Sequence, residues 1–115
     1  DWYRMAADLY PGLFERPGEH ADEVETSLGL AFFPELMHLE LADNGAARPS
    51  RFDAINRGWV SITRPWHLVS ANTGLGDPSA ASADKGRRLM DALVERLAGF
   101  LTELAAAPLD ESFPF

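Results

Sequence analysis

Residues 19–28 read Glu-His-Ala-Asp-Glu-Val-Glu-Thr-Ser-Leu, and they stand where a Pro-Gly loop enters an apolar segment. Residues 21–33 carry apolar side chains at helical spacing, and Pro34 cannot continue a helix. Asp22 and Glu23 fall in the expected first turn, where the positive end of the helix dipole favours carboxylates. The stretch therefore predicts a helix over 21–33 with a polar cluster at its amino end.

Two interpretations of this polar cluster are open. Glu25 shares its helical face with Phe32, so its burial has to be offset by a donor or a cation, and a metal ion is one such cation. His20 comes five residues earlier, so both side chains can point into one cleft. In the alternative, His20 binds backbone only, and Asp22 and Glu23 merely complement the helix dipole.

Two other segments have strong helical periodicity. Residues 2–9 place their apolar side chains on one stripe, and residues 79–106 repeat leucine at the spacing of a core-facing helix. Ser82 is a candidate N-cap for the second helix, whose leucine stripe we expect in the core and whose arginines we expect in solvent. Residues 50–53 resemble a weak capping box, which predicts a short helix ending at Gly58.

Between these helices the sequence indicates extended structure. Residues 59–63 have an alternating pattern of side chains and are rich in β-branched residues, which makes them the best strand candidate. Residues 66–70 are a second extended candidate. Residues 72–78 contain two glycines and a proline and predict a loop, in which we expect Asp77 to brace a turn. We expect His38 at the surface and His67 in a partly buried structural position.

Composition excludes several classes of function. The chain has 115 residues, of which 46% are hydrophobic, typical of one globular domain or part of one. Ten basic and eighteen acidic residues give a net charge of −8, so we expect neither nucleic acid nor an anionic membrane as a partner. The absence of cysteine excludes disulfides and thiolate zinc sites and leaves the cytoplasm as the default compartment.

Two motifs in the same order resemble the creatininase (creatinine amidohydrolase) family. Residues 19–28 resemble its His-Ala-Gly-x-x-Glu-Thr-Ser segment, with Asp22 in place of the motif's glycine. Residues 73–78 and 81–86 resemble its Gly-x-x-Gly-Asp-Pro and Ala-Thr-x-Glu-Lys-Gly segments. The resemblance covers about residues 1–107 and places residues 1–115 in the C-terminal portion of a single family domain.

The resemblance implies a three-layer α/β/α fold and a metal-dependent amidohydrolase. Such an enzyme hydrolyses the C–N bond of a small non-peptide or cyclic amide with a metal-activated water, using zinc, manganese or iron. His20 matches the histidine that shuttles a proton to the departing nitrogen. Glu25 matches the glutamate at the metal centre, as a ligand or as a general base. The resemblance also implies a homo-oligomer, commonly a hexamer.

The departures from the family pattern also lead to expectations. The family's Glu-x-His…Asp and Asn-Gly-His metal segments come before the part that this chain matches, so we expect this chain alone to be inactive. Residues 16–19 replace the Trp-Asp pair of creatinine-specific members, which argues against creatinine as the substrate. A non-catalytic binding or assembly module on the same scaffold is the alternative. The aromatic tail, Phe113 to Phe115, is either an interface element or docks on its own core.

Overall fold

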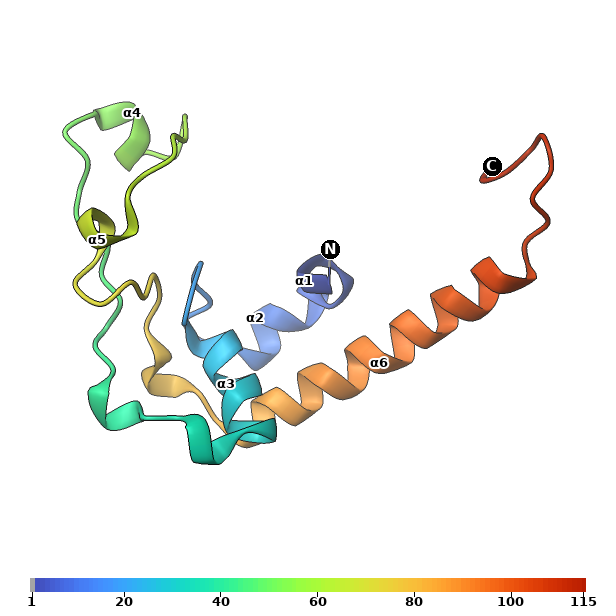
Figure 1. Cartoon of the computed structure of the whole chain (residues 1–115), viewed down its shortest axis with the longest axis horizontal. Coiled ribbons are helices and arrows are strands. Elements are labelled where there is room, and N and C mark those ends of the chain that lie inside the picture. Colours follow the sequence, from blue (N-terminus) through green and yellow to red (C-terminus); the bar gives the residue numbers. More distant parts are fainter. Residues whose placement is uncertain (1) are drawn as a thin grey trace.

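The computed structural model describes residues 2–115 as helices joined by long loops (Figure 1). The elements, in chain order, are α1 (Trp2–Met5), η1 (Ala7–Leu9), α2 (Tyr10–Leu13), α3 (Glu23–Phe32), η2 (Pro34–Leu36), η3 (Leu39–Leu41), α4 (Asp53–Asn56), α5 (Trp66–Val69), η4 (Pro78–Ala80) and α6 (Ala83–Ala106), where η denotes a 3-10 turn. Among the elements of residues 2–115, only α3 and α6 are longer than four residues, so these two helices form the framework.

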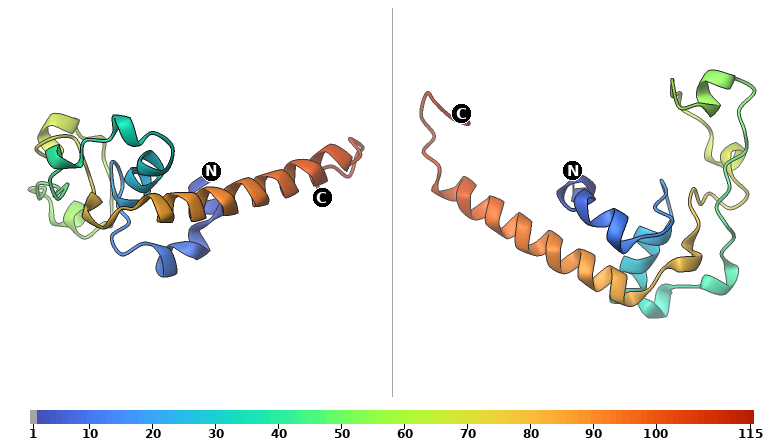
Figure 2. Two further views of the ribbon diagram at one scale, coloured as in Figure 1. Left: turned by 90° about the horizontal axis from the view of Figure 1, so that it is seen from below. Right: turned by 180° about the vertical axis from the view of Figure 1, so that it is seen from behind.

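The core forms where α3 crosses the first turns of α6 and the amino-terminal helices lie alongside (Figure 2). Six buried apolar side chains make it up: Ala6, Leu13, Phe14, Val24, Leu89 and Leu93. Gly86 allows the close crossing, because a Cβ built there would lie 2.1 Å from the carbonyl oxygen of Ser27. The crossing places the start of α3 next to the start of α6.

Helix α6 confirms most of the prediction for residues 79–106. Ser82 is its N-cap as predicted, with its hydroxyl accepting from the Lys85 amide at 3.3 Å, and residues 78–80 form the separate turn η4. The prediction that the leucine stripe faces the core is confirmed for Leu89 and Leu93, near the start of the helix, and is wrong for the later leucines. Val94, Leu97, Phe100, Leu101 and Leu104 are exposed.

The extended-structure predictions for residues 59–63 and 66–70 are wrong within the part of the chain that the structure describes. The amides of Trp59 and Val60 donate to the Ala54 carbonyl, at 3.0 and 3.4 Å, and not to a neighbouring strand. Trp59 is 71% exposed, so residues 59–63 remain a loop rather than a strand. Residues 66–69 form α5 instead, because Pro65 starts a turn in which its carbonyl accepts from the Leu68 amide at 2.9 Å. No β-strand is present between residues 2 and 115, so the α/β layering is not visible here.

Two shorter helix predictions need adjustment. The helix expected over residues 2–9 ends at Met5 and continues as η1, and the helix after residue 50 covers only Asp53–Asn56. Ser50 is not the N-cap of α4, since that position is Phe52; instead the Asn56 side chain holds both backbone groups of Ser50. The glycine stop is confirmed, as Gly58 adopts a φ of +70° directly after the helix.

The carboxy-terminal tail leaves α6 without folding back on the core (Figure 2). Leu109 is 85% exposed and Phe115 is fully exposed, so the docking alternative for the aromatic tail is wrong in this structure. Within residues 2–115, no helix combines the length and the apolar character that crossing a bilayer requires.

Candidate functional site

The candidate site lies where the loop before α3 meets the loop of residues 72–78. The His20 amide donates to the Leu75 carbonyl at 3.2 Å, and the Leu75 amide donates back to the His20 carbonyl at 2.8 Å. The two residues thus form an isolated antiparallel bridge, which the Glu19 amide extends by a 2.7 Å bond to the same Leu75 carbonyl. This bridge fixes the backbone that carries the imidazole.

Asp22 organises the amino end of α3. It is the N-cap, one residue earlier than the predicted first-turn position, and its carboxylate accepts from the Glu25 amide at 2.9 Å and the Gly18 amide at 2.6 Å. Gly76 has a φ of +156°, and a Cβ there would lie 2.4 Å from the Asp22 Cβ. The glycine therefore allows the 72–78 loop to pass directly over the helix start.

The structure brings His20 and Glu25, the two predicted site residues, together. The imidazole Nδ1 lies 3.5 Å from Glu25 Oε2, and the same oxygen accepts from the Ala21 amide at 2.7 Å. The Trp66 ring packs on the imidazole at a centroid distance of 5.1 Å and a tilt of 58°. Both side chains remain accessible, with 49% of His20 and 37% of Glu25 exposed. Both side chains are therefore accessible to a ligand from solvent.

As metal ligands, His20 and Glu25 supply one imidazole and one carboxylate. Zinc, manganese and iron all accept this combination, but a protein site for these ions uses three or more such donors. Among residues 2–115, no group of three or more His, Cys, Asp or Glu side chains is arranged to hold an ion. The pair fits part of a ligand set, and its chemical roles stay predictions.

A buried ion pair that the sequence pattern does not predict lies beside the site. Glu23 is fully buried, and its carboxylate accepts from Lys85 Nζ at 2.5 Å and from the amides of Glu15 and Arg16 at 2.9 and 2.6 Å. Burial alone would raise the pKa of Glu23, but these donors outweigh it and hold the pKa below its usual value. The same contact with Glu23 raises the pKa of Lys85. We call Glu15, Arg16, Glu23 and Lys85 the clasp.

Asp77 connects the clasp to the loop of residues 72–78. Its carboxylate accepts from the Ser79 amide at 2.9 Å, which confirms that it braces the turn, and it also receives the guanidinium of Arg16. Hydrogen bonds from Ser79 and the contact with Arg16 together lower the pKa of Asp77. The two loops that frame His20 are thus tied to each other by polar contacts.

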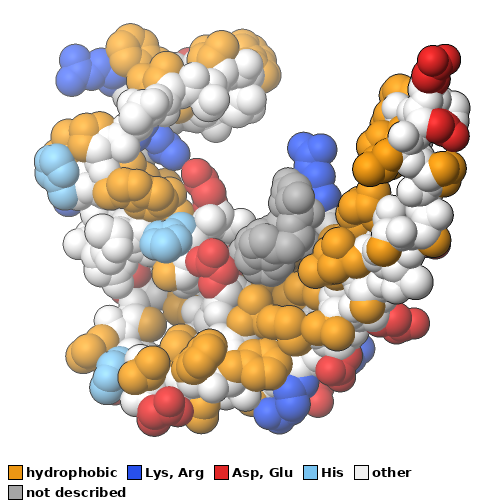
Figure 3. Space-filling view, turned by 45° about the vertical axis from the view of Figure 1, so that its right-hand side comes forward, with side chains coloured by type: hydrophobic (Ala, Val, Ile, Leu, Met, Phe, Trp, Pro, Cys, Tyr) orange, Lys and Arg blue, Asp and Glu red, His pale blue; other side chains and the backbone are white. Residues whose placement is uncertain are grey.

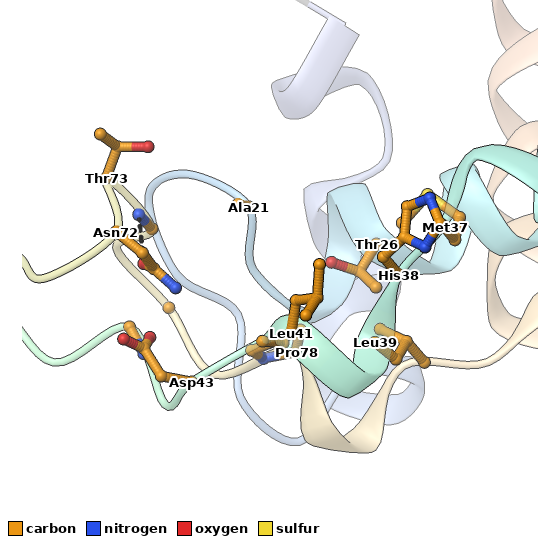
Figure 4. A pocket seen from close by; sticks show the side chains of 14 residues that line it. Ala21, Thr26, Met37, His38, Leu39, Leu41, Asp43, Asn72, Thr73 and Pro78 are labelled. Atoms are coloured by element: carbon orange, nitrogen blue, oxygen red, sulfur yellow. Dashed lines mark hydrogen bonds between the residues drawn. The ribbon is translucent and has the colours of Figure 1, made fainter.

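A shallow pocket of about 210 Å³ opens beside the site (Figure 4). It is lined by Ala21 from the loop before α3, by Thr26 of α3, by the 37–43 segment and by the 72–76 loop, and it does not include His20 or Glu25. His38 lines it and is exposed, as predicted, with Nδ1 3.1 Å from Glu40. His67 is also exposed, which corrects its predicted partial burial.

The chain is similar to known proteins over most of its length. A family model described as "Creatininase: Creatinine amidohydrolase" matches residues 3–101. The chain belongs to the creatininase family. A curated relative, "3-dehydro-scyllo-inosose hydrolase" of Thermotoga maritima, is 33% identical over 117 residues, covering 84% of this chain and 37% of the relative.

A solved structure supports the creatininase fold directly. The crystal structure of "Putative creatinine amidohydrolase" from Bacteroides fragilis superposes with a TM-score of 0.83 at 33% sequence identity. The match covers 96% of this chain and 44% of that one. The chain thus spans less than half the length of either relative.

Proposed function

We propose that the full-length protein is a metal-dependent hydrolase that cleaves the C–N bond of a small non-peptide or cyclic amide. The observation that carries this proposal is the 3.5 Å approach of His20 to Glu25 at the start of α3, in a chain of the creatininase family. Hydrolase chemistry is also what the family description and the name of the Thermotoga maritima relative have in common.

His20 is the proposed proton donor to the departing nitrogen. Its backbone is fixed by the bridge to Leu75, while its half-exposed ring stays open to a substrate. As the C–N bond breaks, the imidazolium gives its proton to nitrogen and the hydroxyl of water joins the carbonyl carbon, so that an amine and a carboxylic acid result. The second proton of the water returns the imidazole to its charged form.

Glu25 is the proposed residue of the metal centre, either as a ligand or as the general base. A bound zinc, manganese or iron ion supplies a water activated for attack at neutral pH. The proposal places the remaining ligands outside this chain, in accord with the incomplete donor set of residues 2–115. Glu25 Oε2 already accepts from Ala21 and faces His20, so the carboxylate is held in one orientation.

The Thermotoga maritima relative raises a second substrate class. Its name specifies a carbocyclic keto compound without an amide nitrogen. A cyclic carbonyl compound is therefore the second candidate substrate for this protein. In that reaction the hydroxyl of water joins a ring carbonyl carbon, the adjacent ring C–C bond breaks, and the same two residues deliver the other proton of the water to the released carbon.

Substitution of Glu25 tests the proposal and separates its two possible roles. The full-length protein is loaded with zinc, manganese or iron and assayed with cyclic amides, formamides and 3-dehydro-scyllo-inosose. Glu25→Gln is expected to lower kcat by about 100-fold or more with the fold intact. Loss of bound metal in this variant identifies a ligand, and retained metal identifies a general base.

The matched control is Glu35→Gln, which removes the same charge from an exposed position on η2. It is expected to leave both kcat and metal content unchanged. Near-normal activity of Glu25→Gln would overturn the assignment. A folded full-length protein with neither bound metal nor hydrolysis of any tested class would favour the binding or assembly module instead.

The proposal extends to the architecture of the whole protein. We propose a complete domain with three α/β/α layers, of which residues 1–115 form the C-terminal portion. We also propose that the protein is cytoplasmic and forms a homo-oligomer, a hexamer by family resemblance. The 0.83 TM-score supports the family fold. Light scattering after size-exclusion chromatography measures the oligomer directly.

A further inference from the structure

Glu23, the buried carboxylate of the clasp, lies between the two residues of the candidate site in the chain. Glu23 stands three residues after His20 and two before Glu25, yet its carboxylate points into the protein and is fully buried. Two of its partners are the amides of Glu15 and Arg16, at the beginning of the loop that leads to His20. One carboxylate thus ties that loop to the helix that carries Glu25.

Lys85 ties this arrangement to α6. Its ammonium contacts Glu23 at 2.5 Å, the Ala80 carbonyl at 2.9 Å and Glu15 at 3.4 Å, and its side chain is 19% exposed. Without the ammonium, the Glu23 carboxylate would be a buried charge with only neutral amides as partners. The loop and the helix start could then not keep their present packing.

We infer that Lys85 is a positioning residue for the candidate site. By joining Glu23 and Glu15 to the carbonyl of Ala80, it holds the 15–22 segment against α3 and so keeps the His20 imidazole within reach of Glu25. Lys85 itself touches neither of them through any hydrogen bond found in this structure. The kinetic part of this inference rests on the proposed function, whereas the structural part does not.

Lys85→Met in the full-length protein tests the inference by hydrogen–deuterium exchange. The amides of Glu15, Arg16 and Gly18 are bound to clasp or cap carboxylates, so exchange over residues 15–22 is expected to rise in this variant. Exchange over residues 89–100 of α6 is expected to stay at the wild-type rate. A general loss of stability would instead raise exchange in both regions. Unchanged exchange over 15–22 overturns the inference.

The kinetic test separates positioning from substrate binding. Lys85→Met is expected to lower kcat by about 10- to 100-fold with KM little changed, as for groups that orient catalytic residues indirectly. Lys85→Arg keeps the charge and is expected to recover most of kcat. A full loss of kcat with wild-type exchange over 15–22 overturns a positioning role. If the wild type hydrolyses no tested substrate, the proposed function fails and the exchange measurement still decides the inference.

Two further variants keep the test decisive. Arg88→Met removes a charge from the next turn of α6, where Arg88 faces Asp84 at 3.9 Å in solvent, and it is expected to change nothing. If Lys85→Met does not fold, the double variant Glu23→Gln with Lys85→Met restores neutrality. This variant is expected to fold and still show raised exchange over 15–22, because the link to Ala80 is gone. Wild-type exchange in the double variant overturns the inference.

Discussion

The two halves of α6 carry one continuous apolar stripe but differ in what covers it. In the first half, Gly86, Leu89 and Leu93 are buried against α3 and the amino-terminal segment. In the second half, Leu97 is 45% exposed and Leu101 is 51% exposed, and Figure 3 shows the hydrophobic side chains continuing along the helix in the open. Periodicity thus identifies the apolar face, whereas burial depends on a second element that reaches it.

Different contacts anchor the two halves. The first half has a glycine crossing, where the α6 backbone approaches Ser27 closely enough to exclude any side chain at Gly86. The second half is tied to the amino-terminal segment by Arg96, whose guanidinium donates to the Met5 carbonyl and to both carboxylate oxygens of Asp8. Apolar packing and the buried Lys85–Glu23 ion pair hold the first half, and an exposed ion pair holds the second.

Leu89→Ala against Leu101→Ala is expected to show the largest difference between the halves. Leu89 is fully buried, so its truncation leaves a cavity and should lower the free energy of unfolding by about 3 kcal/mol. Leu101 is half exposed in the 115-residue chain, so the same truncation should lower it by less than about 1 kcal/mol. Urea unfolding of both variants at neutral pH measures the two values.

The same pair of variants in the full-length protein sharpens the comparison. If residues outside this chain cover the second half of α6, Leu101→Ala becomes as destabilising there as Leu89→Ala. Equal losses in the 115-residue chain itself would contradict the difference in burial between the two halves.

Gly86→Ala and Gly99→Ala are expected to change the free energy of unfolding in opposite directions. At Gly86 the new methyl group would meet the Ser27 carbonyl oxygen at 2.1 Å, so α3 and α6 must separate, at a cost of about 1–3 kcal/mol. At Gly99 no atom lies within 4 Å, so alanine should stabilise the helix by up to about 1 kcal/mol. Each variant is the other's control in the same unfolding measurement. A stabilising Gly86→Ala would show that the helix crossing tolerates a side chain.

The structural features that could be predicted from the sequence are those that depend on residues close together in the chain. The start of α3, the cap at Ser82 and the proximity of His20 to Glu25 all follow from residues within five positions of one another. The predicted position of Asp22 lies one residue too far into the helix, because Asp22 and Glu23 both suit the first turn and only the backbone shows which residue is the cap.

The errors concern contacts between distant residues. Residues 59–63 have the composition of a strand, but a strand needs a partner, and no segment of residues 2–115 supplies one. Glu23 and Lys85 are 62 positions apart, and neither the acidic cluster nor the leucine helix indicates that they meet. One signal in the sequence is Lys85 itself, which follows the Gly-Asp-Pro motif. It stands in the first turn of a helix, where the helix dipole does not favour a basic residue.

The ion pair of the second half offers the smallest expected effect, and pH reveals it. The hydrogen bond from Arg96 holds the pKa of Asp8 below its ordinary value. Because the folded-state pKa is lowered, the pair stabilises the chain above the unfolded-state pKa, and this contribution disappears as the pH falls below about 4. The measurement is the Tm of the wild type and of Arg96→Met between pH 7 and pH 2. We expect a small difference in Tm between the two proteins that stays constant down to about pH 5 and then narrows. The difference that remains at low pH is due to the hydrogen bond with the Met5 carbonyl. Arg88→Met removes the same charge from the first half of the helix, and its Tm difference from the wild type should not narrow in this way. If the Tm difference for Arg96→Met stays constant down to pH 2, Asp8 does not anchor the second half.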